Sequence, residues 1–430
     1  MRIVVGARNS PLSQAQLRET LQNIQKHHPD IVFDAHLVAT RGDHDQKTSL
    51  RSLDKTDFFT AEVDELLLSG QCRVAIHSAK DLPEPLPQGL RIIALTQGMD
   101  PSDSLVMRPG QYITTLPTGA LVATSSERRE EAVQQLRDDL RFIDIRGTIA
   151  QRLAKLDSGE ADAIVLAEAA LIRLGLTHLN RIRLPGATTP HQGQLAIMAR
   201  EEDEEMQQLF RCLDSRNQPA TLYLGLDHPN HLSDKRLIHY PIIQIVPRSL
   251  DTHEIQEAIS DLPNYTHLLF TSKNAVRILV RYLMRHHGDI SQLQGKCCIA
   301  VGQATAKTLQ QCNISPDIIA QEEHAEGMIK KLETLSLKES YFFWPHSSLS
   351  RSVLIEFFQS RRLRYRQCIL YDTQPYLPEP LPDLNQIDEI IFTSPSTVDA
   401  FIAAYGHLPK NKTLTPIGPV TKNHLAFSNV

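Results

Sequence analysis

The stretch Val74-Ala75-Ile76-His77-Ser78-Ala79-Lys80-Asp81-Leu82-Pro83 decides how the first half of the chain folds. A short β-rich run followed by a polar cluster and a proline is typical of a strand that ends in a loop. In open α/β sheets, ligands bind at that end of the strands. The stretch also places an imidazole, a hydroxyl, a cation and a carboxylate within five residues. It therefore predicts a functional site, although a solvated surface loop stays open on this motif alone.

Length and composition limit the class of protein and the number of domains. The 430 residues are 41% hydrophobic and 22% charged, as in a soluble globular chain with room for about two to four domains. The net charge of −5 predicts no attraction to nucleic acid. There is no apolar run of the roughly 18 residues that span a bilayer, and no signal peptide opens the chain. The six cysteines lack CxxC spacing, which favours reduced, mostly buried thiols. We predict a cytoplasmic protein without a membrane or nucleic-acid partner.

Short runs of branched apolar residues alternate with helical patterns throughout the chain. This alternation predicts α/β domains built on mainly parallel sheets. In the first half the predicted strands are Ile3–Val5, Ile31–Val38, Val74–Ile76, Leu121–Ala123, Phe142–Ile145 and Ala163–Leu166, and the predicted helices are Pro11–Gln25, Ala61–Leu68, Arg128–Leu136 and Thr148–Leu156.

The second half contains an internal duplication. Leu268–Ser272 recurs as Ile390–Ser394, and Val301–Thr305 recurs as Ile417–Thr421. Each segment is a strand that leads into a helix, where Thr or Ser caps the first turn and the helix start favours anions. Two generic strand-to-helix turns are the alternative, but two matched pairs in the same order favour two similar α/β domains.

A boundary is predicted between the halves. The acidic helix Glu201–Cys212 is followed by a polar segment, Leu213–Ala220, that has the composition of a linker. A new strand begins at Thr221–Leu224, so we place the main boundary near residues 215–220.

Basic and hydroxyl residues gather at the predicted strand-to-helix turns of the first half. In a parallel sheet these turns meet at one edge, and arginines there bind carboxylates or phosphates in bidentate fashion. The nucleotide signatures GxxxxGK[ST] and GxGxxG are absent, which favours a polycarboxylate over a nucleotide. Asp81, ringed by cations, is the best acid–base candidate because it can accept ligand N–H groups and stabilise a developing cation. The turns carry Arg8, Ser10, Arg41, Lys80, Thr124, Ser125, Ser126, Arg128, Arg129, Arg146, Gly147, Arg152 and Arg173.

The order of these motifs resembles the porphobilinogen deaminase (hydroxymethylbilane synthase) family over residues 1 to about 215. The motifs are Arg8–Leu12, Thr40–Asp43, His77–Pro83, Asp100–Asp103, Thr124–Arg129, Arg146-Gly147 with Arg152, and Gln192-Gly193. The resemblance implies two domains of the type II periplasmic-binding-protein kind with the active site between them. It also implies the head-to-tail joining of four porphobilinogen units with release of ammonia.

The same resemblance assigns roles to individual residues. Asp81, with Lys80 beside it, would be catalytic: its carboxylate would bond pyrrole N–H groups and stabilise the cationic intermediate. Phe59 matches the family's active-site loop, whose glycine-lysine-glycine segment is absent here, with Lys55 displaced by one position. The cofactor and the substrate carboxylates would be bound by Arg8, Ser10, Phe59, Ser78, Thr124, Ser125, Ser126, Arg128, Arg129, Arg146, Gly147, Arg152 and Arg173.

One departure concerns the cofactor. The resemblance implies a dipyrromethane primer, but the family's third domain, which carries the cysteine that attaches it, is replaced here by a different domain. Cys212 lies in the preceding helix, where a buried structural thiol is the favoured interpretation. Three alternatives stay open: the primer is held without a thioether, another chain supplies it, or turnover is weak or absent.

Residues 221–430 resemble uroporphyrinogen-III synthase. The motifs are His239–Ile243, Phe270–Val276, Ala300–Gly302 with Thr305, Tyr371–Thr373, Phe392–Ser396 and Ile417–Pro419. That family has two α/β domains joined by a two-stranded ladder, here Pro241–Val246 and Gln367–Thr373, and it closes hydroxymethylbilane into uroporphyrinogen III without a metal. The residues implied to orient the substrate are Thr271, Ser272, Thr305, Tyr371, Thr393 and Ser394. The arginine usual after the family's first strand is replaced around Asp227–Pro229.

Together the resemblances predict a multifunctional enzyme of tetrapyrrole (haem) biosynthesis, a transferase followed by a lyase, acting on porphobilinogen and hydroxymethylbilane. The alternative is a non-catalytic two-lobed module for polycarboxylates or pyrroles in the first half, with only the synthase half active. The oligomeric state stays open. The predicted domains are 1–96 with 194–215 and 97–193 in the deaminase half, a linker at 216–220, and 221–248 with 376–430 and 249–375 in the synthase half.

Overall fold

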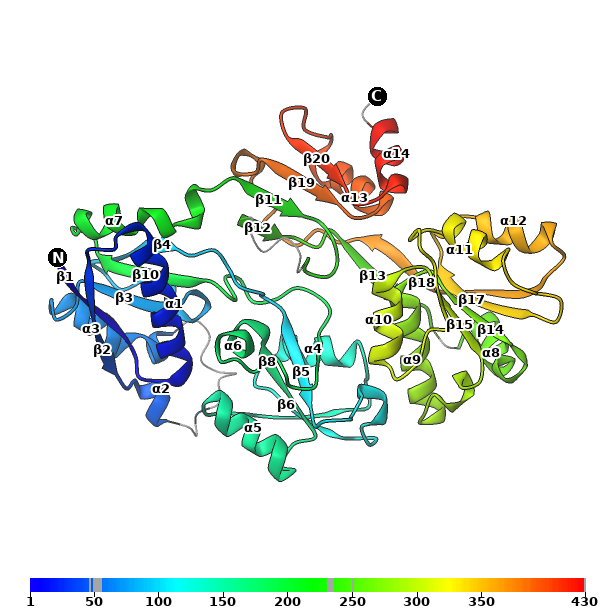
Figure 1. The fold of residues 1–430 in the computed structure, drawn as a ribbon, viewed down its shortest axis with the longest axis horizontal. Coiled ribbons are helices and arrows are strands. Elements are labelled where there is room, and N and C mark those ends of the chain that lie inside the picture. The colour runs from blue at the N-terminus through cyan, green and yellow to red at the C-terminus, as the bar shows by residue number, and fades with distance from the viewer. Residues whose placement is uncertain (46–47, 49–55, 230–235, 250, 429–430) are drawn as a thin grey trace.

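The computed structural model describes residues 1–45, 48, 56–229, 236–249 and 251–428. Its strands form four sheets, which define four α/β units in chain order (Figure 1). Lys55 of the predicted active-site loop lies outside the described residues. Among the described residues, no helix combines the length and the apolar character needed to cross a membrane.

The first unit is a five-stranded mixed sheet with strand order β2-β1-β3-β10-β4. Strand β1 runs parallel to β2 and β3, whereas β10 is antiparallel to both β3 and β4. The parallel strands therefore deliver their carboxyl ends to one edge, as the sequence predicts. The strands are β1 (Arg2–Arg8), β2 (Val32–Val38), β3 (Val74–Ser78), β4 (Leu90–Leu95) and β10 (Leu195–Arg200), and the helices are α1 (Pro11–His27), α2 (Arg41–His44), α3 (Ala61–Leu68) and α7 (Glu204–Phe210).

The second unit repeats this design with strand order β7-β6-β8-β5-β9. Here β6 is parallel to β7 and β8, and β5 is antiparallel to β8 and β9. The chain enters this unit between β4 and β5 and returns between β9 and β10, so two crossing segments join the lobes (Figure 1). The elements are β5 (Asp103–Met107), β6 (Leu121–Ala123), α4 (Glu127–Gln134), β7 (Arg141–Ile143), α5 (Ile149–Ser158), β8 (Ala163–Ala167), α6 (Glu168–Arg173) and β9 (Arg181–Arg183).

The third unit is a parallel sheet with order β12-β11-β19-β20, and the fourth has the order β13-β18-β17-β14-β15-β16. The antiparallel pair β13–β18 confirms the predicted two-stranded ladder but shifts its bounds, since Ile243–Pro247 pairs with Tyr371–Pro375. The third unit contains β11 (Ala220–Tyr223), β12 (Arg236–His239), β19 (Glu389–Phe392), α13 (Pro395–Tyr405), β20 (Thr413–Pro416) and α14 (Pro419–Phe427). The fourth contains β13 (Ile243–Pro247), α8 (His253–Ser260), β14 (His267–Phe270), α9 (Lys273–His287), β15 (Cys297–Ala300), α10 (Gln303–Gln311), β16 (Ile318–Ile319), α11 (Ala325–Leu332), β17 (Tyr341–Ser347), α12 (Val353–Ser360) and β18 (Arg364–Pro375).

The duplicated turns are confirmed as strand-to-helix junctions, but the threonine caps are only partly right. Ser272 caps α9 by accepting a hydrogen bond from the Asn274 N–H at 3.0 Å, and Ser394 holds the equivalent place before α13. In the second pair the helices begin after Gly302 and Gly418. Thr305 therefore falls three residues inside α10 and is buried, so its predicted capping role is wrong.

One prediction at the boundary between the halves also needs correction. Helix α7 ends at Phe210, and Cys212 lies exposed in a single 3₁₀ turn instead of buried in the helix. Leu213 from that turn packs on the core, which leaves Cys212 facing outward. Asp214 accepts a hydrogen bond from the Leu95 N–H at 3.1 Å and so packs with the first unit, inside the range 194–215 predicted for that domain.

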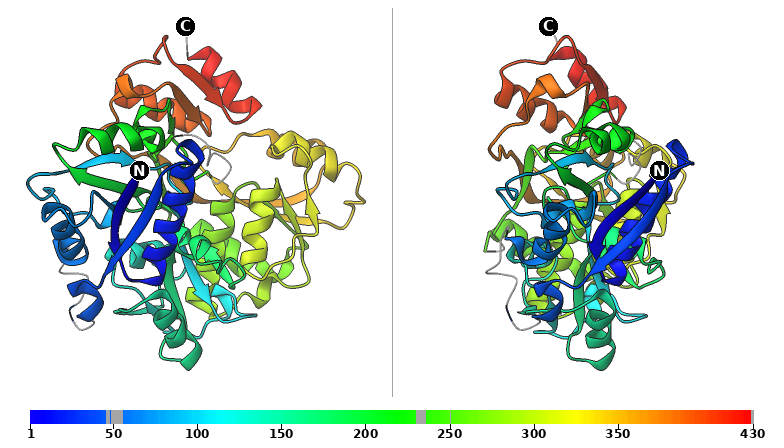
Figure 2. Two further views of the ribbon diagram at one scale, coloured as in Figure 1. Left: turned by 60° about the vertical axis from the view of Figure 1, so that its left-hand side comes forward. Right: turned by 90° about the vertical axis from the view of Figure 1, so that its left-hand side faces the viewer.

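The two halves are in direct contact. Asp138 in the second unit accepts hydrogen bonds from Arg281 and Arg285 of α9, each at 3.2 Å. The Thr114 hydroxyl donates to the carbonyl of Cys312 at 3.2 Å. The left view of Figure 2 shows the second unit beside the yellow-green helices of the fourth unit. The second and fourth units therefore form the interface between the halves.

Candidate functional site

The stretch Val74–Pro83 forms a strand exit, as predicted. Lys80 and Asp81 end a 3₁₀ turn, Ala79–Asp81, directly after β3. The Ala79 N–H donates to the carbonyl of Gln194 at 3.0 Å, which ties this turn to the chain segment that returns from the second unit. The turn is thus fixed where the two lobes meet.

Lys80 is held by a residue of the returning segment. Its ammonium donates to the Gln192 side-chain oxygen at 3.0 Å, and Gln192 in turn donates to the Asp103 carboxylate at 3.0 Å. Burial lowers the pKa of Lys80; Asp81 and Asp103 oppose this shift, and Arg129 and Arg152 add to it. Lys80 therefore shares its surroundings with the predicted arginines.

Asp103 organises those arginines. Its carboxylate is 1% exposed and accepts hydrogen bonds from Arg128 at 2.5 Å and from Arg129 at 2.6 and 2.9 Å. Burial alone would raise the pKa of Asp103, but Arg129 and Arg128 lower it to about 2. In the sequence, Asp100–Asp103 contributed to the resemblance, but no role was predicted for Asp103. An acidic residue at the start of a buried strand could have indicated that it pairs with a cation.

Arg152 extends the group of cations. It donates to the carbonyl of Gly147 at 2.9 Å, and burial together with Arg129 and Arg146 lowers its pKa to about 10, against the opposing effect of Asp81. Cations that depress one another's pKa are short of anionic partners, which is typical of a site for an anionic ligand. We call Lys80, Arg128, Arg129, Arg146 and Arg152 the cation cluster.

An aromatic wall closes one side of this site. The Arg8 guanidinium lies 4.6 Å from the centre of the Phe59 ring, and that of Arg146 lies 5.7 Å from it. Gly42 leaves room for this ring, since a Cβ there would clash with it. The Nε atoms of Arg8 and Arg146 and the Thr124 hydroxyl are buried without a hydrogen-bond partner among the described residues. Buried donors without partners are rare and point to a ligand with several acceptor groups.

Other predicted residues hold the backbone of the site. Ser10 caps α1 by accepting from the Ser13 N–H at 3.2 Å, and Ser78 accepts from Gln16 at 2.8 Å. The remaining turn residues are Ser125, whose hydroxyl bonds both backbone groups of Ile145, Ser126, which precedes α4 as its N-cap residue, and Gly147, which has a φ of +96°.

Arg173 joins the two lobes. Its guanidinium pairs with Glu19 of α1 at 2.6 Å and donates to the carbonyl of Gly193 at 2.9 Å. The side chain is 4% exposed, so its charge is already used between the lobes.

In the second half, the predicted hydrogen-bonding residues contact one another. The buried Tyr371 hydroxyl donates to the Ser272 side chain at 2.9 Å, and the Trp344 indole donates to the Thr271 hydroxyl at 3.2 Å. Burial raises the pKa of Tyr371, and its bond to Ser272 opposes that rise. Tyr371 therefore positions the cap of α9.

Two carboxylates of the chain itself meet the helix starts of the fourth unit. Asp227, in the loop after β11, pairs with Lys273 at 2.5 Å and Arg277 at 3.5 Å. Glu323 accepts a hydrogen bond from the Gln303 N–H at the start of α10, at 2.9 Å. Sequence reasoning noted Asp227 only as part of a departure from the family and missed Glu323, because neither is near its partner in sequence.

The fold and the site define a two-lobed α/β protein with a cation-lined site, continued by a second two-unit α/β body. Residues 3–208 match the family model described as porphobilinogen deaminase, dipyrromethane cofactor binding domain. Residues 235–430 match the model described as uroporphyrinogen-III synthase HemD.

The relatives agree with the first match. The chain is 37% identical over 227 residues to porphobilinogen deaminase of Rubrobacter xylanophilus, which covers 51% of this chain and 71% of the relative. It is 41% identical over 206 residues to the probable porphobilinogen deaminase of Chlamydia muridarum, covering 48% of this chain and 84% of that relative. The chain belongs to the porphobilinogen deaminase family, and a uroporphyrinogen-III synthase domain forms its second half, as the sequence predicts.

Solved structures were also found for both halves. The uroporphyrinogen-III synthetase of Helicobacter pylori gives a TM-score of 0.36 at 18% identity, covering 49% of this chain and 90% of the other. A probable amino-acid transporter extracellular-binding protein of Bacillus subtilis gives 0.34 at 11% identity, covering 50% and 90%.

A substitution at Asp103 tests the organisation of the cation cluster. We expect Asp103→Asn to destabilise the protein by about 3 kcal/mol, since it removes the charge of the buried carboxylate that the partly buried Arg128 and Arg129 share. Urea unfolding followed by circular dichroism measures the loss, and Asp157→Asn on the exposed face of α5 is the control. Equal stability of the two variants would contradict the role given to Asp103.

Proposed function

We propose that the first half joins porphobilinogen units into hydroxymethylbilane with release of ammonia, and that the second half closes hydroxymethylbilane into uroporphyrinogen III. The observation that carries the first assignment is one carboxylate, Asp81, set among the cation cluster within the segment that matches the deaminase family. That match favours an enzyme over a non-catalytic binding module. The linear product of the first reaction is the substrate of the second, so the two activities are consecutive.

Asp81 is the proposed catalytic residue. It is half-buried. Its electrostatic neighbours are Lys80 and Arg152. A carboxylate held in this way can accept pyrrole N–H groups and stabilise positive charge that develops on the substrate. The surrounding cations then bind the acetate and propionate arms.

The site fits the dipyrromethane cofactor that the family match names. The unpartnered donors of Arg8, Thr124 and Arg146 are available to bind its carboxylates, and Arg129 and Arg152 lie in the same electrostatic group. When bound, the cofactor supplies the primer to which the pyrrole units are joined.

We propose that this primer is held without a thioether. Cys212 is exposed in the turn after α7, and that turn packs against α1 and β4 instead of among the cation cluster. Asp214 and Ser215 then bond to Leu95 before the chain enters β11 of the synthase half. Charge-assisted bonds from the arginines are the contacts that the structure offers in place of a covalent link.

In the second half, we propose that the capped helix starts orient the carboxylate arms of hydroxymethylbilane. Ser272 and Ser394 are the N-cap residues of α9 and α13. The N-terminal ends of such helices favour anions. The Asp227–Lys273 pair brings the loop after β11 close to the start of α9. The reaction needs positioning of a flexible chain more than it needs side-chain acid–base groups, which suits these contacts.

The first test is Asp81→Asn. We expect porphobilinogen consumption to fall at least about 100-fold with folding intact, because a single preorganised electrostatic group is worth about that much. The rate is measured by loss of porphobilinogen, with exposed Asp30→Asn as the control. A near-normal rate in Asp81→Asn would rule out the catalytic role.

The second test concerns the primer. Purified protein is compared before and after denaturation by intact mass, and we expect a dipyrromethane-sized mass to be lost when the fold is lost. Cys212→Ser should retain whatever activity the unchanged chain has. Peptide mapping that finds the primer on Cys212 would overturn non-covalent binding.

The third test uses authentic hydroxymethylbilane. The chain should yield the type III isomer in excess of type I, which forms spontaneously. Ser272→Ala should slow the enzymatic closure about fivefold, since loss of a helix cap costs about 1 kcal/mol. Ser260→Ala at the exposed end of α8 is the control. Production of type I alone by the unchanged chain would exclude synthase activity.

A further inference from the structure

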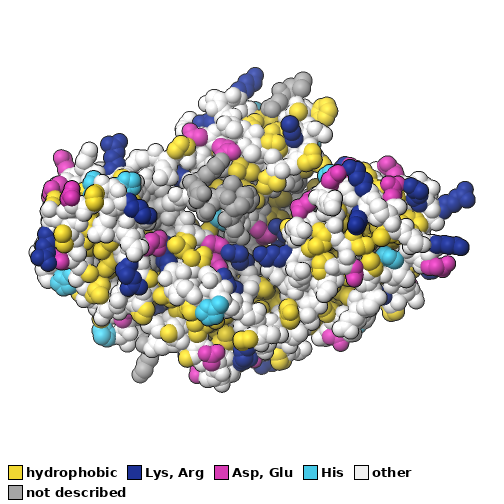
Figure 3. Space-filling view, in the orientation of Figure 1, with side chains coloured by type: hydrophobic (Ala, Val, Ile, Leu, Met, Phe, Trp, Pro, Cys, Tyr) yellow, Lys and Arg dark blue, Asp and Glu magenta, His cyan; other side chains and the backbone are white. Residues whose placement is uncertain are grey.

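A pocket of about 430 Å³ lies between the two halves and is lined by both. Arg181 and Arg183 reach it from β9 of the deaminase half, Lys273 and Arg277 from α9, and Lys307 from α10 of the synthase half. These five cations face two lining carboxylates, Glu168 and Asp227, so positive charge is in excess. We call this the shared pocket. Figure 3 shows Lys and Arg side chains gathered in the hollow near the middle of this face.

Most of these cations are fixed in place. Arg181 pairs with Glu168 at 2.6 Å, and Arg183 pairs with Asp100 at 2.7 Å. Asp227 holds both α9 cations, as described above. Arg183 keeps 37% of its side chain exposed, and Lys307 has no acidic partner among the described residues. The pocket thus presents ordered cations that a ligand can still reach.

The shared pocket adjoins the deaminase site through one short segment. Asp100, which holds Arg183, lies three residues before Asp103, which holds Arg128 and Arg129. Gln192, the partner of Lys80, donates to the carbonyl of Pro101 between them. The two sets of cations therefore lie on either side of residues 100–103.

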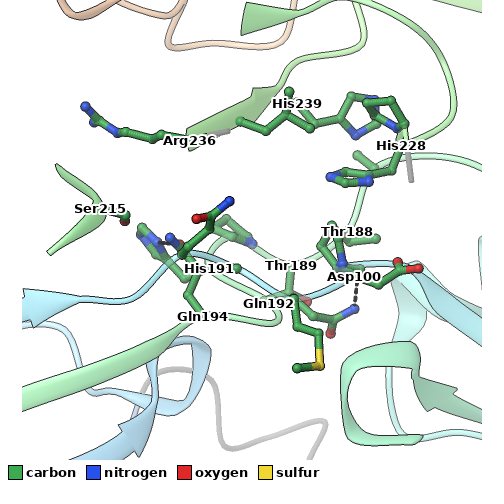
Figure 4. Close-up of a pocket in the computed structure, with 18 residues that line it drawn as sticks. Asp100, Thr188, Thr189, His191, Gln192, Gln194, Ser215, His228, Arg236 and His239 are labelled. Atoms are coloured by element: carbon green, nitrogen blue, oxygen red, sulfur yellow. Dashed lines mark hydrogen bonds between the residues drawn. The ribbon is translucent and has the colours of Figure 1, made fainter. Parts of the chain in front are cut away.

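A second pocket, of about 210 Å³, lies along the same segment. Figure 4 shows Thr189 and Gln192 on one side of it and His228 and His239 on the other. Thr189 and Gln192 bond Arg128 and Lys80 of the cation cluster, and His228 also lines the shared pocket. The two pockets therefore meet at His228, between the deaminase site and the synthase half.

We propose that the shared pocket binds the linear tetrapyrrole polycarboxylate on its way into the synthase half, with Arg183 of the deaminase half and Lys307 of the synthase half holding its carboxylate arms. The inference rests on the proposed function of the two halves and adds that the deaminase half supplies part of the synthase binding site. Every ring of this intermediate carries two carboxylate arms, which matches a pocket with surplus cations. A volume of about 430 Å³ accommodates one part of such a chain.

Asp227 should weaken the binding of a polycarboxylate in the shared pocket, whereas Arg183 and Lys307 should strengthen it. Its carboxylate already occupies Lys273 and Arg277, so an incoming carboxylate must share them or displace it. Removing the charge of Asp227 should therefore strengthen ligand binding, whereas removing that of Arg183 or Lys307 should weaken it. Opposite signs distinguish a specific site from general damage to the fold.

The experiment measures KM for added hydroxymethylbilane on the full chain and, independently of turnover, the Kd of the stable polycarboxylate uroporphyrin I by fluorescence. We expect Arg183→Gln and Lys307→Gln each to raise both constants about tenfold, because a charge-assisted hydrogen bond is worth roughly 1.5 kcal/mol or more. Asp227→Asn should lower both, and Arg183→Lys should lie between Arg183→Gln and the unchanged chain. The matched controls are Arg141→Gln and Lys331→Gln, which are exposed on β7 and α11 and should change neither constant.

The outcomes separate this inference from the proposed function. If the chain closes hydroxymethylbilane and Arg183→Gln has unchanged constants, the shared pocket is wrong and the synthase assignment stands. If the chain closes no hydroxymethylbilane but the Kd of uroporphyrin I depends on Arg183 and Lys307, the synthase assignment fails while the pocket is supported as a polycarboxylate site. Displacement of uroporphyrin I by inorganic phosphate at the same concentration would show a site for any small anion and would overturn the proposal.

Discussion

The buried carboxylate of Asp103 is the interaction on which the first half depends. It begins β5 immediately after the chain crosses into the second unit, and it binds Arg128, Arg129 and Gln192. Because Gln192 lies on the returning segment and also receives Lys80, one anion connects both crossings with both lobes. Partly buried arginines that lost this buried carboxylate would destabilise the fold. The geometry around Asp81 is therefore a consequence of how the lobes are joined.

Both halves contain a group of cations, and the two groups differ in how many carboxylates of the chain itself pair with them. In the deaminase half, burial and then repulsion from Arg129 and Arg146 lower the pKa of Arg152 to about 10, against the opposing effect of Asp81. In the synthase half, Asp227 and Glu323 supply the chain's own carboxylates to the starts of α9 and α10. The cation cluster of the deaminase half therefore has few carboxylate partners. In the synthase half, the chain's own carboxylates already neutralise part of the positive charge. A polycarboxylate chain would therefore enter the first site readily and compete with internal carboxylates in the second.

Local sequence patterns predicted the features that depend on neighbours in the chain. The strand exit at Lys80 and Asp81, the ladder of β13 and β18 and the cap at Ser272 are all present. The capping role was wrongly given to Thr305 because the helix begins directly after Gly302, three residues earlier. The role of Asp103 was missed, since its partners Arg128 and Arg129 come from a different element and their pairing needs the folded sheet. Local patterns thus predicted elements and families, while pairings in space required the structure.

The contact between the halves extends this argument to the whole chain. Asp138 fixes the second unit to α9 through Arg281 and Arg285, and the same helix carries Lys273 and Arg277 at its other end. One helix therefore holds the interface and part of the shared pocket. A covalent fusion by itself only raises the local concentration of the intermediate. A fixed interface does more, because it holds Arg183 of one half in the same pocket as Lys273, Arg277 and Lys307 of the other. The proposed binding of the intermediate in the shared pocket depends on that placement.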